Sequence, residues 1–455
     1  MTDATSSLPA APAASAMFRK AIAPLALLTV GSLVAAAMPP TEAADTSGIN
    51  TGDTAWMLTA TALVLLMTPG LSFFYGGMVR PKNVISTMLQ SFIAMSLVSL
   101  VWVVVGFSLA FGDSVGGMIG DPRTYFMLSG VGGAPHPDLS PTIPLALFAL
   151  FQLKFAIITP ALITGSFAER VRFSTYLVFI VLFTLLIYCP LAHMTWHPDG
   201  LLRGWGVLDF AGGTVVHMSA GFAALVGAWV LGPRRDHTPG QVHTPANIPY
   251  VLLGTGMLWF GWFGFNAGSA LAASTTAVHA FLTTNTASAS AMFAWLLVDA
   301  LRGVRPSAMG ACIGAVVGLV AITPAAGFVS VGSSMAIGAF ASIISNIAAK
   351  WKSTTQLDDT LDVFPCHGVG GIVGMIATGL FADKRVNPAG ADGLFHGNPE
   401  LFQYHMIGLL LVGAFVLLGS LMLYKLVDAV STLRVSADQE AEGLDISQHG
   451  ESLPL

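Results

Sequence analysis

The sequence predicts an all-α polytopic membrane protein, because its composition is apolar and its apolar residues come in long runs. Of the 455 residues, 54% are hydrophobic and only 9% are charged, and the mean hydropathy is +0.73. A soluble domain usually carries about 25% charged residues, so this chain has too few to cover a soluble surface. After residue 45, eleven apolar runs of about 20 residues follow one another.

The same composition excludes several classes of protein. A net charge of -5 with only 19 Lys and Arg residues argues against nucleic-acid binding. Three cysteines in apolar runs, Cys189, Cys312 and Cys366, do not make a disulfide framework. Cys366 precedes His367, but no second close pair of ligands accompanies them, so we interpret it as a small packing residue. We expect no metal, no cofactor and no catalytic residues.

The first 45 residues resemble a leader. MFRK (17–20) is a short basic start, AIAPLALLTVGSLVAAAM (21–38) is apolar, and PPTEAAD (39–45) offers small residues for cleavage. We predict a signal peptide over residues 1–45. The alternative is an additional membrane helix, which the short apolar run and Pro24 disfavour.

The mature chain divides into a membrane domain, residues 46–427, and a polar tail, residues 428–455. The tail is a docking or regulatory segment, or a solvated end. The predicted spans of the membrane domain are residues 54–78, 84–111, 143–168, 173–193, 207–231, 250–270, 278–301, 307–325, 328–349, 361–382 and 402–427.

The placement of basic residues predicts the orientation. With the mature N-terminus outside, the inner loops and tail hold twelve Lys and Arg residues and the outer loops hold four. Cytoplasmic loops are enriched in Lys and Arg, so we predict an N-out, C-in topology. An odd number of spans requires opposite ends, which agrees with this orientation. The four outer residues are Arg123, Arg203, Lys384 and Arg385.

Two similar stretches suggest an internal repeat. LDFAGGTVVHMSAG (208–221) in span five and LDVFPCHGVGG (361–371) in span ten each begin Leu-Asp and carry a histidine among glycines. If spans one to five and six to ten are repeats, the second enters the membrane from the opposite side, because five is odd. This is an inverted repeat, an architecture that places a transport site near the midplane.

The histidines of these stretches are the first functional candidates. Ionisable groups within a membrane are rare and usually face a cavity or a partner. We expect His217 and His367 to meet near the centre, where neutral imidazoles both donate and accept hydrogen bonds. The alternative is that each is a separate hydrogen-bonded core histidine. We interpret Asp209 and Asp362, its expected inner counterpart, as carboxylates that cap helix starts. The alternative is direct contact with a substrate.

Aromatic residues form a second candidate set, since aromatic faces and a hydroxyl can bind a small cation. Phe151 and Phe155 lie four residues apart, and Trp262 and Phe265 lie three apart, as on one face of a helix. Ser269 follows Phe265 by one turn, and Trp196 lies in an outer loop. Such pairs more often serve packing, and the lone tryptophan equally suits an interfacial anchor. The set is Phe151, Phe155, Trp262, Phe265, Ser269 and Trp196.

The chain resembles the ammonium transporter (Amt/Mep/Rh) family, on its Amt/Mep branch. The matching stretches occur in order over roughly residues 54–452. They are FYGGMVRPKNV (74–84), FQLKFAIITPALITGSFAERVRF (151–173), LDFAGGTVVHMSAG, GWFGFNAGS (261–269), LDVFPCHGVGG and LRVSADQEAEGLDISQHGES (433–452).

The resemblance assigns roles to these residues. His217 and His367 match the twin pore histidines of the family. The remaining matches fall into three groups. They are the phenylalanine gate, Phe155 and Phe265 with Phe151 beside them; the outer ammonium recruitment site, Trp196 and Ser269 with Phe155, supported by Asp209; and the pore-lining residues Trp262 and Tyr75.

The resemblance also implies passage of ammonium or ammonia through a homotrimer of the inner (plasma) membrane, with one pore per subunit, in nitrogen metabolism. It implies a PII-type signalling protein as partner at the cytoplasmic face. Alternatives are an ammonium sensor, an Rh-like neutral gas channel and an intramembrane metalloenzyme. The short tail disfavours a standalone sensor, and no His-Glu-x-x-His set supports a metalloenzyme.

Lys154 lies between the two phenylalanines of span three and has no role in the family pattern. We interpret it as a snorkelling or paired lysine away from the pore. If it faced the outer vestibule, its charge would oppose recruitment of a cation.

Overall fold

The computed structural model describes residues 14–38, 45–241 and 243–453. It divides into two compact units, residues 1–42 and 43–455, which we describe separately. The first unit contains helix α1 (Ala14–Ala37), which includes Pro24. Residues 1–13 and 39–44, with most of the expected cleavage region, lie outside the described residues. The signal peptide therefore stays a prediction.

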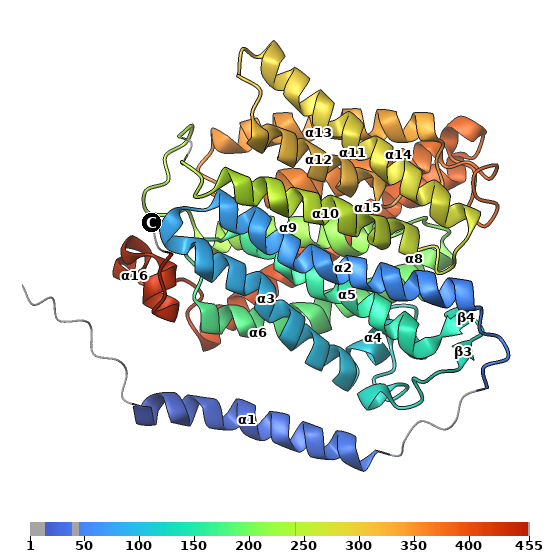
Figure 1. Cartoon of the computed structure of the whole chain (residues 1–455), viewed down its shortest axis with the longest axis horizontal. Helices are drawn as coiled ribbons and strands as arrows, with labels where there is room; N and C mark the ends of the chain where they lie inside the picture. The colour runs from blue at the N-terminus through green and yellow to red at the C-terminus, as the bar shows by residue number, and fades with distance from the viewer. Residues whose placement is uncertain (1–13, 39–44, 242, 454–455) are drawn as a thin grey trace, which may run out of the picture. The chain divides into compact units, whose positions relative to one another are not determined.

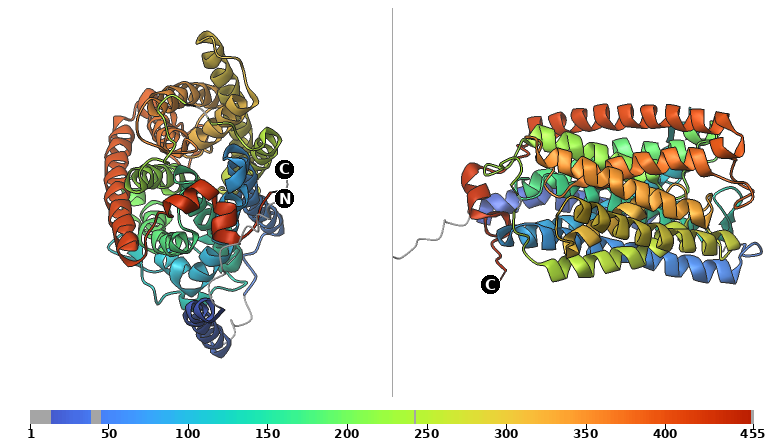
Figure 2. Two further views of the ribbon diagram at one scale, coloured as in Figure 1. Left: turned by 90° about the vertical axis from the view of Figure 1, so that its left-hand side faces the viewer. Right: turned by 90° about the horizontal axis from the view of Figure 1, so that it is seen from above.

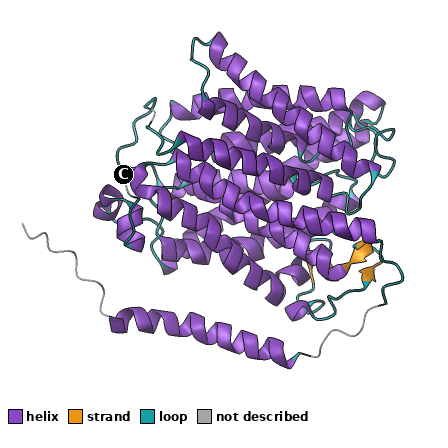
Figure 3. Cartoon of the chain, in the orientation of Figure 1, coloured by secondary structure: helices purple, strands orange, loops and turns teal. Residues whose placement is uncertain are grey.

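The second unit is a bundle of long helices that run alongside one another (Figure 1 and Figure 3). Ten of its helical segments are long and apolar enough to cross a membrane, which confirms the predicted fold class. In order they are α2 (Thr51–Met78); η1 (Pro81–Asn83), α3 (Val84–Val101), η2 (Trp102–Gly106) and α4 (Phe107–Phe111); α5 (Leu145–Ile163) and η4 (Thr164–Ser166); α6 (Phe173–Phe183), η5 (Thr184–Tyr188), α7 (Cys189–Trp196) and α8 (Leu201–Gly204); η6 (Gly213–Met218) and α9 (Ser219–Leu231); α10 (Ile248–Gly268); α11 (Thr275–Leu301); α13 (Val331–Ser353); η7 (Phe364–Val369) and α14 (Gly370–Phe381); and α15 (Pro399–Val430).

The predicted eighth span corresponds to a shorter helix, α12 (Ala308–Ile322), of 15 residues. At 1.5 Å per residue it is about 22 Å long, less than the roughly 30 Å of a hydrocarbon core. It is buried along nearly all its length and packs against α10, α11, α13 and α14. The count of eleven spans, like the orientation, stays a prediction.

The two ends of the bundle differ. One end carries two short antiparallel hairpins, β1 (Ser114–Val115) with β2 (Ile119–Gly120) and β3 (Pro135–His136) with β4 (Ser140–Pro144). The other end carries the tail, which contains α16 (Ala437–Glu442) and η9 (Asp445–His449). The end-on view of Figure 2 shows that the helices between these ends lie side by side. The prediction assigns the hairpin end to the outside and the tail end to the cytoplasm.

Glycines allow the helices at the centre to approach closely. A Cβ at Gly221 in α9 would overlap the backbone nitrogen and Cα of Gly368 in η7. Along α10, a Cβ at Gly264 would lie 2.7 Å from the carbonyl oxygen of Ala60 in α2. Small residues at helix crossings are typical of membrane bundles, because they let backbones come into contact. Here they bring the two histidine-bearing segments together.

The tail docks on the bundle through specific contacts. The Asp445 carboxylate accepts hydrogen bonds from the backbone N–H groups of Ile85 and Ser86, at 3.1 and 2.8 Å, and so caps α3. The Asn83 side chain accepts a hydrogen bond from the Leu444 N–H at 2.8 Å. These contacts hold part of the tail against the bundle, and its predicted role as a docking or regulatory segment stays a prediction.

Candidate functional site

The structure brings His217 and His367 together at the centre of the bundle. Each sits in a six-residue π-helical turn, η6 and η7, at the start of its span. Their Nδ1 atoms are 3.3 Å apart, and both rings are buried. At that distance one Nδ1 donates and the other accepts, so the pair shares one proton between two neutral imidazoles. The Nε2 atom of His217 is buried and has no partner among the described residues.

Aromatic rings stack above this pair. The ring of Trp262 stacks on His217, with centroids 5.3 Å apart, and its Nε1–H donates to Thr323 Oγ1 at 2.9 Å. The Phe265 ring lies 5.9 Å from His217 and 5.4 Å from Trp262, so the three rings contact one another. Phe155 lies 4.3 Å from Phe265. These rings form a continuous wall from the hairpin side of the bundle to the histidines.

Two cavities lie on either side of the Phe155–Phe265 pair. The outer one, on the hairpin side, has a volume of about 510 Å³, and Phe155, Trp196 and Ser269 are among its lining residues. The inner one has a volume of about 10 Å³, and Phe265, His217 and His367 are among its lining residues. A volume of this size holds about one water molecule. The two phenylalanines are therefore the boundary between a wide entrance with both polar and apolar walls and a narrow apolar chamber.

The predicted recruitment residues meet in the outer cavity. The rings of Phe155 and Trp196 are 5.8 Å apart in an edge arrangement, and Phe151 lies 4.9 Å from Phe155. Trp196 is held in place by its Nε1–H, which donates to the carbonyl oxygen of Asp209 at 3.1 Å. The Ser269 hydroxyl donates to the Phe265 carbonyl at 2.8 Å, which leaves its lone pairs to face the cavity.

The Asp209 carboxylate accepts hydrogen bonds from nearby residues of its own chain. Oδ1 accepts from the N–H groups of Gly212 and Gly213 at 2.8 and 2.7 Å. Oδ2 accepts from both the N–H and the hydroxyl of Thr214, at 2.7 and 2.5 Å. These bonds satisfy the donors at the start of η6, so the carboxylate organises the turn that carries His217.

The prediction that Asp362 is the inner counterpart of Asp209 is wrong. Asp362 does not cap its helix; it pairs with the Lys352 ammonium group, 2.7 Å away. The cap is Asp359, whose carboxylate accepts from the N–H groups of Val363 and Phe364 at 3.1 and 2.7 Å. Asp359 precedes His367 by eight residues, as Asp209 precedes His217. Matching the two Leu-Asp pairs misled the prediction, whereas the spacing to the histidine would have found the right residue.

Two predicted residues lie apart from both cavities. The Tyr75 hydroxyl is buried and donates to the carbonyl of Leu162 at 2.9 Å, but Tyr75 lines neither of the two cavities. Lys154 also lines neither cavity, which agrees with its interpretation as a lysine away from the pore.

The three cysteines are free and buried. Among the described residues no cluster of three or more His, Cys, Asp or Glu side chains could hold a metal ion.

Sequence reasoning missed His405 in α15. Its Nδ1 lies 2.9 Å from the carbonyl oxygen of Met375, and its Nε2 accepts from the Leu208 N–H at 3.0 Å. Since a carbonyl only accepts, Nδ1 carries the proton and Nε2 is the acceptor. The ring thereby ties the segment before Asp209 to α14, which follows His367. A lone histidine in an apolar helix was the available signal.

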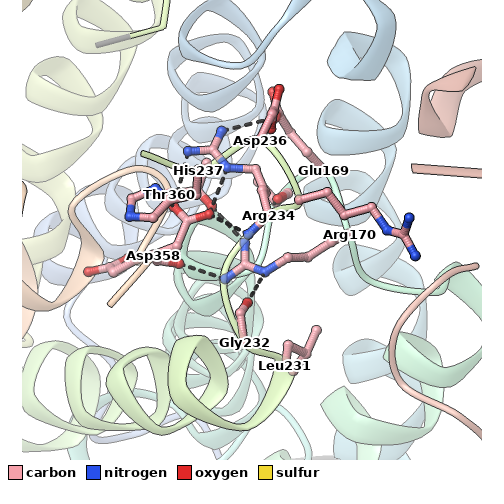
Figure 4. A network of polar contacts seen from close by, with 12 residues as sticks. Glu169, Arg170, Leu231, Gly232, Arg234, Asp236, His237, Asp358 and Thr360 are labelled. Carbon is pink, nitrogen blue, oxygen red and sulfur yellow. Dashed lines mark hydrogen bonds and ion pairs between the residues drawn. The ribbon is translucent and has the colours of Figure 1, made fainter. Parts of the chain in front are cut away.

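A network of ion pairs closes the tail end of the bundle (Figure 4). The Glu169 carboxylate accepts from Arg80 Nε at 2.7 Å and from an Arg234 terminal nitrogen at 2.9 Å. The Arg234 guanidinium also donates two hydrogen bonds to the Asp358 carboxylate, of 2.8 and 3.0 Å. Although burial raises their pKa values, the surrounding guanidinium groups hold the pKa of Glu169 and of Asp358 below the ordinary carboxyl range. In the sequence these arginines contribute only to the charge pattern that predicts orientation.

Comparison with known proteins gives a consistent result. The model of the Ammonium Transporter Family matches residues 55–453. The ammonium transporter of Bacillus subtilis is 46% identical over 407 residues, which cover 88% of this chain and 98% of that protein. Ammonium transporter Amt1 of Archaeoglobus fulgidus is 43% identical over 400 residues, covering 88% of this chain and 98% of that one.

Solved structures agree with the sequence relatives. The crystal structure of Saccharomyces cerevisiae Mep2 superposes with a TM-score of 0.82 at 34% identity, covering 87% of this chain and 89% of that chain. A structure described as a sensor Amt protein gives a TM-score of 0.80 at 31% identity, covering 88% of this chain and 98% of that chain.

Proposed function

The chain belongs to the ammonium transporter family, and on that premise we propose that it binds ammonium at its outer cavity and conducts ammonia past the two histidines. The observation that carries this proposal is the pair of unequal cavities. A 510 Å³ entrance can admit a hydrated cation, whereas a chamber of about 10 Å³ lined mainly by apolar side chains cannot. The Phe155–Phe265 pair therefore marks the place where ammonium must lose its water and its proton.

Recruitment uses the aromatic wall of the entrance. The ring faces of Trp196 and Phe155 attract a small cation through their electron density. The Ser269 oxygen accepts a hydrogen bond from one N–H group of the ammonium ion. Asp209 supports the site indirectly, since its carboxylate is engaged by the start of η6 and its carbonyl holds Trp196.

Loss of the proton follows from desolvation. Beyond the phenylalanines, the low dielectric disfavours a charged form, so ammonium gives up its proton more readily than in water. Ammonia then meets two imidazoles that offer both a donor and an acceptor. A potassium ion has no proton to lose, so the apolar chamber excludes it. The route of the proton decides whether transport is electrogenic or neutral.

The setting follows from the family and from the charge pattern. We place the protein in the plasma membrane as a homotrimeric transporter without enzymatic activity, with its N-terminus outside and its tail in the cytoplasm. The docked tail and the ion-pair network beside it offer a surface for a PII-type signalling protein. An ammonium sensor is the second candidate function, because the chain also resembles a structure described as a sensor Amt protein. A neutral gas channel of the Rh type is the third.

Currents from proteoliposomes on a solid-supported membrane test the function. We expect an ammonium jump to produce uptake, visible as a current or, for neutral passage, as a rise of internal pH. His217→Ala should abolish it, because the shared-proton pair is broken. Uptake of ammonium by the wild type no greater than by protein-free vesicles would rule out transport and leave the sensor.

A further inference from the structure

Besides the recruitment residues, four further oxygen-bearing side chains line the outer cavity, namely Asp138, Asn387, Gln152 and Thr195. Of these, we consider Gln152 and Thr195. Both side chains are more than nine-tenths buried, with 8% and 3% of their surface exposed. Gln152 Oε1 and Thr195 Oγ1 are buried acceptors without a hydrogen-bond partner among the described residues. A buried polar oxygen without a partner is costly, and such oxygens are few in folded proteins.

Neighbouring hydroxyl groups do not share this property. The Thr159 hydroxyl donates to the Phe155 carbonyl at 2.7 Å, and the Ser269 hydroxyl donates to the Phe265 carbonyl at 2.8 Å. Thr214 donates to the Asp209 carboxylate. These three hydroxyls each donate to a protein oxygen, whereas Thr195 Oγ1 and Gln152 Oε1 make no hydrogen bond among the described residues.

Both side chains are carried by the helices that hold the aromatic wall. Gln152 lies on α5 directly after Phe151 and three residues before Phe155. Thr195 directly precedes Trp196 at the end of α7. Because the carboxamide of Gln152 can turn by 180° at little cost, its oxygen and its nitrogen can exchange places at the cavity wall. The two oxygens thus belong to the same entrance as Ser269.

We propose that Gln152 and Thr195 bind ammonium directly. Their oxygens accept hydrogen bonds from its N–H groups as the cation leaves water. This inference rests on the proposed function. An ammonium ion has four N–H donors, and Ser269 supplies one acceptor oxygen. The carbonyl oxygen of Gln152 and the hydroxyl oxygen of Thr195 supply two more, and the aromatic faces complete the shell.

Neutral oxygens suit a site whose ligand must later lose its proton. A carboxylate would stabilise ammonium over ammonia and oppose deprotonation, because an opposite charge favours the charged form. Of the two carboxylates that line the outer cavity, Asp209 is engaged by four hydrogen bonds and Asp138 is exposed. Gln152 and Thr195 replace water without adding charge.

Half-saturating ammonium concentrations, taken from the currents or pH changes of proteoliposomes, test the inference. Thr195→Val keeps the shape and removes the hydroxyl, while Thr195→Ser keeps a hydroxyl. Gln152→Leu removes the carboxamide. A hydrogen bond to a charged group is worth about a factor of ten, so Thr195→Val and Gln152→Leu should each raise the half-saturating concentration about tenfold. Maximal transport should stay within about twofold, and Thr195→Ser should behave as the wild type.

Two further variants make the test decisive. Thr184→Val is the matched control, because Thr184 is buried, donates to the Ile180 carbonyl at 2.7 Å and lines neither cavity. Gln152→Glu should lower the half-saturating concentration and slow maximal transport, since a carboxylate holds the cation. Wild-type half-saturation in both Thr195→Val and Gln152→Leu would overturn the inference while leaving the transport function intact. Absence of ammonium transport by the wild type would instead overturn the proposed function.

Discussion

At the residue scale, Asp209 illustrates how a buried charge in a membrane protein serves its own backbone. Its four short hydrogen bonds fix the turn from Gly212 to Thr214, and its carbonyl fixes Trp196. The carboxylate therefore determines both the place of His217 and the shape of the entrance, although it does not need to touch the substrate.

The first prediction concerns this carboxylate. Asp209→Asn replaces one acceptor oxygen by an N–H₂ group that faces backbone donors, which should lower the stability of the protein by about 1–3 kcal/mol. Thermal unfolding in detergent measures the loss. Asp121→Asn is the control, because Asp121 pairs with Arg123, whose side chain is exposed, and such surface pairs contribute little to stability. Equal effects of the two substitutions would contradict the structural role of Asp209.

Single residues were predicted unevenly. The cost of an ionisable group in lipid pointed to His217 and His367, because few positions in an apolar chain carry one. The unpartnered oxygens of Gln152 and Thr195 could not be predicted, since whether an oxygen finds a partner depends on which helices meet. Asp362 was wrongly chosen over Asp359 because a shared dipeptide was given more weight than the distance to the histidine.

At the element scale, two segments built alike form the centre of the molecule. Each begins with a carboxylate cap, continues as a π-helical turn that carries the histidine and proceeds as an α-helix, α9 or α14. Their contact at Gly221 and Gly368 sets the distance between the imidazoles.

The second prediction tests this contact. Gly221→Ala places a Cβ against the backbone of Gly368, which should cost about 1–3 kcal/mol and separate the histidines. We expect a lower unfolding temperature and a severe loss of ammonium uptake. Gly256→Ala is the matched control in α10, because nothing lies within 4 Å of its added Cβ. Normal uptake by Gly221→Ala would show that the close crossing is not needed.

Helical elements were predicted well where long apolar runs set them, as in α2 and α15. The eighth span differed, because α12 is enclosed by other helices and needs fewer residues than a helix that faces lipid. The π-helical turns and the β-hairpins could not be predicted, since they depend on caps and on contacts between loops distant in sequence.

At the scale of the whole molecule, buried ion pairs join the loops at the tail end. Glu169, Asp358 and Arg234 come from three different loops, so their pairing fixes the ends of the helices that precede and follow them. Sequence could locate these charges but not pair them, because partners lie 65 and 124 residues apart.

The third prediction is the pH dependence of this network. The pKa values of Glu169 and Asp358 are lower in the folded protein than in the unfolded chain. Such carboxylates contribute stability at pH values above their unfolded pKa, about 4, and lose it as pH falls through the folded value. The unfolding temperature should therefore fall steeply below about pH 4. Asp358→Asn should be less stable at pH 7 and less sensitive to acid, and an unchanged pH profile in this variant would contradict the assignment.

We propose that the narrow chamber passes a substrate only after the substrate has lost its proton. The most direct measurement compares ammonium uptake with the flux of radioactive rubidium, in the same proteoliposomes. Rubidium is a cation of similar size that cannot lose a proton. We expect ammonium uptake well above that of protein-free vesicles and a rubidium flux no greater than theirs. A rubidium flux comparable to the ammonium uptake would mean that an intact cation passes between Phe155, Phe265 and the histidines, and it would contradict the account.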